Sequence, residues 1–262
     1  GSLALMGIGG AGCGTAVVLG AVGRSVKREN RTLSLGVVMA AGSLGQFVMV
    51  PIVAYLIQIS SWSNSLINLI FIASLMLLFS YILSFSGKSK SSKEGSDQTI
   101  KESIKEAFSS KSYNLLTIGF FVCGFHVTFV ATHLPAFLED QSLPTWLGGW
   151  SLALVGLFNI IGTLLFGRLG DSLSKKNLLA VLYSLRSVLF LLFIILPKNE
   201  LSVLLFASFL GILWLSTVPL TSGIISDVFG SYYMSTLYGI TFFSHQIGSF
   251  LGSWLGGKIF DF

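Results

Sequence analysis

Long apolar runs alternate with short polar stretches along most of the chain. An α-helix rises 1.5 Å per residue, so roughly 20 apolar residues are needed to cross a hydrocarbon core about 30 Å thick. Runs of that length recur, and none has the strict apolar–polar alternation of a membrane β-strand. The pattern predicts an all-α fold, a polytopic transmembrane helical bundle in which each helix pairs its own backbone groups. The eight predicted spans are residues 3–23, 33–57, 64–85, 113–137, 146–166, 178–196, 201–225 and 234–257.

The composition supports a membrane protein and indicates no cofactor. Of 262 residues, 53% are hydrophobic and only 10% are charged, which is too few to solvate the surface of a soluble domain. Cys13 and Cys123 lie in apolar runs, where they are expected to pack as small hydrophobic side chains and to form no metal site or disulfide. The glycines of 7–12, GIGGAG, have dinucleotide-fingerprint spacing, but no strand precedes them.

The basic residues predict how the chain is oriented in the membrane. Most lie in three loops that alternate along the chain, and loops rich in Lys and Arg face the cytoplasm. The three loops, including residues 86–112, are therefore predicted to be cytoplasmic, with the first residue outside, in a multi-pass protein of the plasma (inner) membrane. Because the bases follow this loop pattern, no nucleic-acid partner is expected. The loop bases are Arg24, Lys27, Arg28, Arg31, Lys88, Lys90, Lys93, Lys101, Lys105, Lys111, Arg168, Lys175 and Lys176.

The longest polar stretch, residues 86–112, gives the best domain boundary. It begins as a Ser/Lys/Gly linker and then places Ile100, Ile104 and Phe108 four residues apart, as on one face of a helix. A short amphipathic helix on the cytoplasmic surface is predicted, either as a tether between two bundles or as a regulatory or partner-binding element. The predicted parts are residues 1–86 with three spans, the linker 87–112, and residues 113–262 with five.

A turn crowded with charge follows the fifth run, at residues 167–176, GRLGDSLSKK. It resembles the cytoplasmic signature loop of the major facilitator superfamily, although Ser172 and Ser174 replace the usual base and glycine. The resemblance implies a gating loop in which the acid caps or pairs at a helix terminus and the bases bind the facing half. Asp171 is expected at the N-terminal end of the helix starting near 177; an ordinary positive-inside turn is the alternative. The implied gating residues are Gly167, Arg168, Asp171, Lys175 and Lys176.

Three further segments extend this resemblance over nearly the whole chain. Residues 31–57, 119–140 and 237–261 resemble the fifth, seventh and eleventh helices of bacterial transporters near the monocarboxylate and oxalate:formate branch. The alignment implies a fragment running from the fourth to the eleventh helix, and a truncated major facilitator fold. It also implies a monomeric secondary transporter, symporter or antiporter, that moves a small-molecule substrate such as an organic anion across the lipid bilayer by alternating access. Protons are the candidate coupling ion.

A membrane enzyme or a non-transporting receptor is the alternative class of function. Enzymes of that kind carry motifs such as H-E-x-x-H or G-x-S-x-G, and the sequence contains neither. No catalytic residue is therefore predicted.

Polar side chains inside the predicted spans are the candidates for substrate binding or proton coupling, because ionisable groups are costly in lipid. His126 and His245 lie near the middle of their spans and are expected to approach one another across the cavity that the resemblance implies. For each, a neutral, hydrogen-bonded histidine is the alternative. Arg186 is the most costly, and its alternative role is to bond backbone carbonyls or a neighbouring helix. Gln46, Asn159 and Gln246 complete this set, while Gly42, Gly45 and Pro51 are predicted to permit close helix approach and bending.

Overall fold

The computed structural model describes residues 14–60, 62–86 and 98–260, and every regular element in these ranges is a helix. This confirms the all-α fold. Five stretches of the described residues are long and apolar enough to cross a membrane. The helices are α2 (Thr15–Ser25), the 3-10 helix η1 (Arg28–Asn30), α3 (Arg31–Ile59), α4 (Trp62–Ser86), α5 (Ile100–Ser109), α6 (Lys111–Asp140), α7 (Trp146–Ser172), α8 (Lys175–Ile195), α9 (Glu200–Leu213), α10 (Thr217–Phe229) and α11 (Met234–Phe260).

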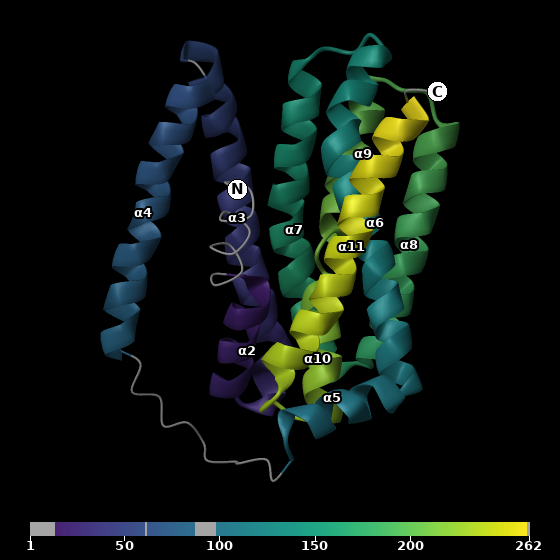
Figure 1. Ribbon diagram of the computed structural model, residues 1–262. Helices are drawn as coiled ribbons and strands as arrows, with labels where there is room; N and C mark the ends of the chain where they lie inside the picture. The colour runs from purple at the N-terminus through teal and green to yellow at the C-terminus, as the bar shows by residue number, and fades with distance from the viewer. Residues whose placement is uncertain (1–13, 61, 87–97, 261–262) are drawn as a thin grey trace.

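The helices form two groups that meet along α3 and α7 (Figure 1). We call α2–α4 the first half and α6–α11 the second half. In the first half, α4 stands apart from the bundle and approaches α3 at one end (Figure 1). In the second half, α6 packs along α11, and α7 packs along α9. We call the end of the bundle that carries Arg28, Arg31 and Lys175 the basic end, and the opposite end the far end.

Within the described ranges, Gly36 and Gly124 allow helices to approach closely, while the role predicted for Gly42 and Gly45 stays a prediction. A Cβ at Gly36 would collide with a backbone carbonyl of α7, and a Cβ at Gly124 with one of α11. By contrast, Gly42 and Gly45 are exposed, and no atom of the described residues lies within 4 Å of a Cβ added at either position. Pro51 lies inside α3, which continues to Ile59.

The predicted span 201–225 is wrong as a single helix, because α9 and α10 are separated by a break at Trp214–Ser216. Pro219 favours the break, because it has no N–H to donate and its ring would clash with the carbonyl four residues earlier. The first N–H groups after the break bond locally, with Val218 N donating to Leu215 O at 2.9 Å. Side chains of other helices bond the backbone at this point, at Leu213 O, Trp214 O and Leu215 N.

The predicted amphipathic helix of the linker is present as α5, which crosses the basic end (Figure 1). A capping box starts it: the Thr99 hydroxyl accepts from Glu102 N, and the Glu102 carboxylate accepts from Thr99 N. The hydrogen bonds from Thr99 lower the pKa of Glu102. Ala107 is buried against the bundle, while Ile100 and Phe108 of the predicted apolar stripe are about half exposed.

Two predictions fall partly outside the described residues. Of the predicted span 3–23, the structure describes α2 from Thr15. Of the predicted linker 87–112, residues 87–97 lie outside the description, and the remainder contains α5 and the start of α6.

Candidate functional site

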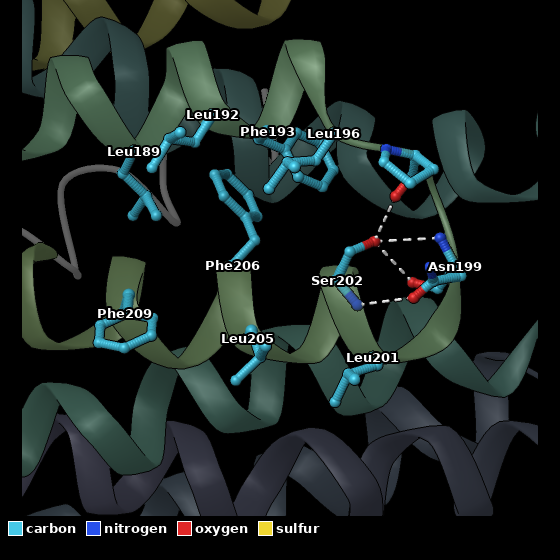
Figure 2. A pocket seen from close by; sticks show the side chains of 11 residues that line it. Leu189, Leu192, Phe193, Leu196, Asn199, Leu201, Ser202, Leu205, Phe206 and Phe209 are labelled. Carbon is cyan, nitrogen blue, oxygen red and sulfur yellow. Dashed lines mark hydrogen bonds between the residues drawn. The ribbon is translucent and has the colours of Figure 1, made fainter.

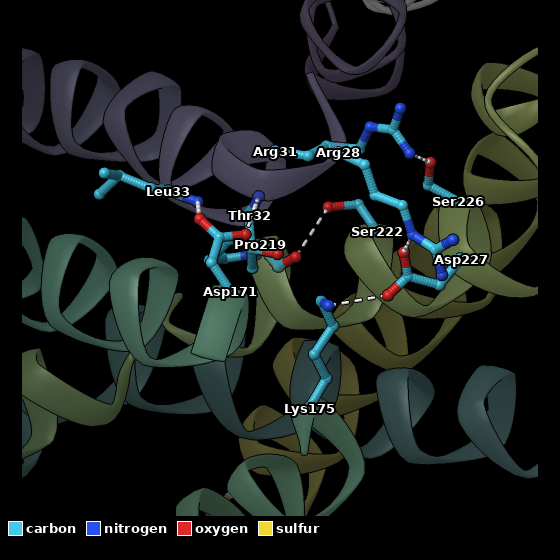
Figure 3. A network of polar contacts seen from close by, with 10 residues as sticks. All are labelled: Arg28, Arg31, Thr32, Leu33, Asp171, Lys175, Pro219, Ser222, Ser226 and Asp227. Carbon is cyan, nitrogen blue, oxygen red and sulfur yellow. Dashed lines mark hydrogen bonds and ion pairs between the residues drawn. The ribbon is translucent and has the colours of Figure 1, made fainter. Parts of the chain in front are cut away.

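Asp171, in the last turn of α7, binds the start of α3 across the boundary between the two halves. Its Oδ1 accepts from Thr32 N at 2.8 Å and its Oδ2 from Leu33 N at 2.9 Å (Figure 3). The first N–H groups of a helix have no partner within it, and the helix dipole favours a negative charge there. The prediction that this acid serves the helix starting near 177 is therefore wrong. It serves a helix N-terminus, but that of α3.

A second acid, Asp227 near the end of α10, completes the contact at the basic end. Its carboxylate lies 2.7 Å from Lys175 Nζ and 3.4 Å from Arg28 Nε (Figure 3). Next to it, Arg31 donates to the Ser226 hydroxyl at 2.8 Å. Of the other bases predicted for gating, Arg168 and Lys176 are exposed. Asp227 was not among the predicted site residues. The signal that could have found it is its place as an acid just after the apolar run 201–225, at the end that faces the base-rich loops.

The contact between α3 and α7 continues from the basic end to the middle of the bundle. At Gly167 the two backbones lie so close that an added Cβ would stand 3.1 Å from Thr32 O. Further along, Asn159 Nδ2 donates to Ser43 Oγ at 2.6 Å, and Gln46 Nε2 donates to Leu152 O at 3.2 Å. Two of the predicted polar residues, Asn159 and Gln46, therefore join the halves in this structure.

Beyond Gln46, α3 and α7 enclose a cleft of about 410 Å³ towards the far end. The cleft is bordered by aromatic rings and small side chains, and Tyr55, Trp146 and Trp150 are each about half exposed or more. Its lining is Val50, Pro51, Tyr55, Thr145, Trp146, Gly149, Trp150 and Ala153. The same pair of helices is thus bonded at the basic end and hollowed at the far end.

Arg186 of α8 is the largest fully buried side chain among the described residues, with 1% exposure. Its Nη2 donates to Leu213 O and, at 2.7 Å, to Trp214 O, which are carbonyls of the break between α9 and α10. Its Nη1 donates to Cys123 Sγ at 3.3 Å. Both ion pairs found in the described ranges involve Asp227, so no carboxylate there neutralises this buried guanidinium.

Asn159 of α7 binds the same break from the other side. Its Oδ1 accepts from Leu215 N at 2.9 Å while its Nδ2 binds Ser43 of α3. The side chain is fully buried and both of its polar atoms are engaged. One amide therefore connects the first half to the interrupted helix of the second half.

The two candidate histidines have different neighbours. His126 is half-buried, and its ring packs 5.4 Å from that of Phe190 on α8. His245 is buried at 6% exposure; its ring lies 4.9 Å from that of Phe120, and its Nδ1 is 3.2 Å from Oε1 of the exposed Gln246. His126 Nδ1 and His245 Nε2 are buried, and no residue in the described ranges hydrogen bonds to either atom. Their approach to one another remains a prediction.

A separate groove of about 360 Å³ lies between α8 and α9 towards the far end (Figure 2). Leucine and phenylalanine side chains form most of it. Its polar members, Asn199 and Ser202, hydrogen bond to one another at the start of α9. The groove is therefore mostly apolar.

Comparison with known proteins agrees with this architecture. The family model of the Major Facilitator Superfamily matches residues 1–253. The "Uncharacterized MFS-type transporter YcxA" of Bacillus subtilis (strain 168) is 28% identical, over 88% of this chain and 58% of its own length. "Monocarboxylate transporter 12-B" of Danio rerio is 25% identical, over 89% of this chain and 56% of its own length. The chain thus spans less than two thirds of either relative. Because the family model covers nearly all of it, the chain belongs to the Major Facilitator Superfamily, and it is a multi-pass membrane protein of a transporter family.

Proposed function

We propose that the protein is a secondary active transporter that moves a small organic anion across the plasma membrane by alternating access. The observation that carries the proposal is the unequal contact between α3 and α7, bonded at the basic end by Asp171 and open at the far end around Gly149. A solute site between two rocking halves needs such an arrangement, reversed in the other state. The proposal places the basic end in the cytoplasm, so that the described state opens outward.

Arg186 supports an anion as the substrate. A guanidinium stays charged in proteins, and an uncompensated charge in a dry interior is costly. Within the described ranges, Arg186 has carbonyl and thiol partners but no acid. The name of the Danio rerio relative, a monocarboxylate transporter, makes short monocarboxylates the first substrates to test.

The test combines uptake with accessibility in proteoliposomes that hold the protein expressed from its complete gene. Uptake of labelled acetate, lactate and pyruvate is measured first, and uptake of at least one is expected. Gly149→Cys then reports the accessibility of the far-end cleft, since a Cβ at Gly149 meets no atom of the described residues within 4 Å. In the background variant every cysteine other than Cys123 is replaced, Cys13→Ser among them, and Cys123 itself is buried. A membrane-impermeant maleimide added outside is expected to label Gly149→Cys.

Adding Asp171→Asn weakens the contact at the basic end and is expected to slow this labelling. A hydrogen bond to a charged group is worth about 1.5–3 kcal/mol, and 1.4 kcal/mol is a tenfold change, so the slowing is about tenfold or more. Gly257→Cys is the matched control, because its Cβ is also unobstructed and it lies outside the cleft. If Asp171→Asn leaves the labelling rate of Gly149→Cys unchanged, the result contradicts alternating access. If none of the three anions is taken up, the result contradicts the substrate class.

A further inference from the structure

We propose that Cys123 carries the proton that accompanies the anion, by serving as the counter-ion of Arg186 whenever the anion is absent. The inference rests on the proposed function and deepens it, because it names the coupling ion and the residue that binds it. The group concerned is a buried cluster of the second half, formed by α6, α8, α10 and α11.

The contacts of Cys123 suit a thiolate. Its Sγ is fully buried and lies 3.3 Å from Arg186 Nη1 and 3.4 Å from Thr217 Oγ1. Both atoms can donate a hydrogen bond to sulfur. Arg186 hydrogen bonds to three groups in the described part of the chain: Cys123 Sγ and two backbone carbonyls. Of these, Cys123 is the one that can carry a negative charge. A thiolate at this position would neutralise the guanidinium without any acid.

Unused hydrogen-bonding capacity around this pair indicates a missing ligand. Arg186 Nε and His245 Nε2 are buried and have no hydrogen-bond partner among the described residues, in side chains that are 1% and 6% exposed. Buried polar atoms are nearly always hydrogen-bonded, so unpaired ones require an explanation. Thr221 Oγ1, one helical turn after Thr217, and the hydroxyl of the fully buried Tyr238 are unpaired as well. A small carboxylate next to Arg186 would accept from its Nε.

Charge and atoms balance in the exchange that we infer. In the empty state the pair is Cys123–S⁻ and Arg186⁺, with net charge zero. One proton and one carboxylate then enter: the proton forms the S–H bond of Cys123, and the carboxylate takes the place of the thiolate at the guanidinium. The net charge is again zero, and release on the other side reverses both steps. The cycle is an electroneutral symport of one proton with one anion.

The neighbouring titratable groups favour the thiol over a histidine as the proton carrier. Tyr183 of α8 stacks near Arg186, which lies 5.6 Å from its ring centroid, and its hydroxyl donates to Gly119 O. Tyr238 and His245 of α11 and His126 of α6 complete the set in the described ranges. Protonating either histidine would add a second positive charge beside Arg186. Protonating the thiolate instead frees the existing charge for the anion.

Cys123→Ser and Cys123→Asp separate proton coupling from anion binding. The protein in the Cys13→Ser background is reconstituted, and equilibrium exchange of labelled lactate at equal pH is compared with accumulation driven by an acidic exterior. Acetate or pyruvate replaces lactate if it is exchanged faster. A serine hydroxyl does not ionise, so the empty carrier keeps an uncompensated Arg186 and returns slowly. Cys123→Ser is therefore expected to retain measurable exchange and to lose gradient-driven accumulation by about tenfold or more. Cys123→Asp, which can ionise, is expected to restore accumulation.

An infrared measurement tests the same step without changing Cys123. Adding lactate to the protein in which Cys123 is the one remaining cysteine is expected to produce an S–H stretching band, because the thiolate becomes a thiol. An S–H band already present before lactate is added would overturn the proposal.

Two transport outcomes are distinguishable failures. If the protein exchanges none of the three anions, both the proposed function and this inference are wrong. If exchange is intact and Cys123→Ser accumulates lactate as well as its background does, the inference alone fails. Loss of accumulation in His126→Gln or His245→Gln, with Cys123→Ser unaffected, would assign the proton to a histidine instead.

Discussion

Asp171 and Arg186 both bind unpaired backbone groups at a helix end, but only Asp171 does so across the boundary between the two halves. Each is a charged side chain that binds backbone groups left unpaired at a helix end, the start of α3 for Asp171 and the end of α9 for Arg186. Asp171 is half-buried and reaches from the second half to the first, whereas Arg186 is fully buried and stays within the second half. Water can replace the partners of Asp171 when the halves part. No such replacement is available to Arg186.

This contrast predicts that Arg186 contributes most to the stability of the second half. Arg186→Gln shortens the side chain and leaves two buried carbonyls, Leu213 O and Trp214 O, without their donor. Because hydrogen bonds to a charged group contribute about 1.5–3 kcal/mol each, a loss of about 3 kcal/mol or more in the free energy of unfolding is expected. Thermal unfolding in detergent measures the effect as a lower Tm.

Arg168→Gln is the matched control, because Arg168 is exposed at the end of α7. Its Tm is expected to stay close to that of the unmodified protein. Equal Tm values for Arg186→Gln and Arg168→Gln would show that the bonds from Arg186 to the carbonyls contribute little to stability. The proposed difference between the start of α3 and the end of α9 would then be wrong.

An intermediate effect is expected where the two kinds of contact meet, at Asn159. Ser43→Ala removes the bond from Asn159 to α3 but keeps its bond to Leu215 N in the break. The unsatisfied Asn159 Nδ2 costs about 1–3 kcal/mol, and only in the state in which α3 and α7 are together. External labelling of Gly149→Cys should therefore slow by roughly fivefold or more, with little change in Tm.

Ser34→Ala provides the comparison for Ser43→Ala, since the Ser34 hydroxyl donates to Asn30 O inside its own half. A large Tm loss in Ser43→Ala, without a change in labelling, would place the Asn159 contact among the permanent bonds of the fold.

The sequence predicted the parts of the structure that depend on local pattern. Apolar runs of sufficient length became helices, as for α3, α6 and α7, because in lipid each helix must pair its own backbone. The charged turn at 167–176 also predicted that Asp171 would lie at a helix terminus. The partner helix could not be read from the sequence, because Thr32 and Leu33 contribute backbone N–H groups, which every residue except proline possesses.

The break between α9 and α10 was missed for a related reason. Hydropathy is continuous from residue 201 to 225, and Pro219 alone did not mark the interruption, since Pro51 lies inside an intact α3. The difference between the two proline-containing segments comes from tertiary contacts. Arg186 and Asn159 satisfy the backbone groups of the break. For Arg186, bonding to backbone carbonyls was the alternative to substrate binding, whereas Asn159 was expected only among the residues for substrate binding or proton coupling. The contact between Cys123 and Arg186 joins residues 63 positions apart, so the sequence did not reveal it. Cys123 was therefore interpreted as a packing residue.

The smallest effect should come from the most exposed part of the contact between the halves. The Arg28 side chain is 76% exposed and lies 3.4 Å from Asp227, which also has the closer Lys175. Exposed ion pairs contribute about 0–1 kcal/mol and are screened by salt. Arg28→Gln should therefore change labelling of Gly149→Cys by less than about fivefold at low salt, and the change should vanish at about 1 M salt. Lys175→Gln, which breaks a contact inside the second half, should leave the labelling rate unchanged at either salt concentration. An effect of Arg28→Gln that equals that of Asp171→Asn and persists at high salt would show that the ion pair, and not the cap on α3, holds the basic end closed.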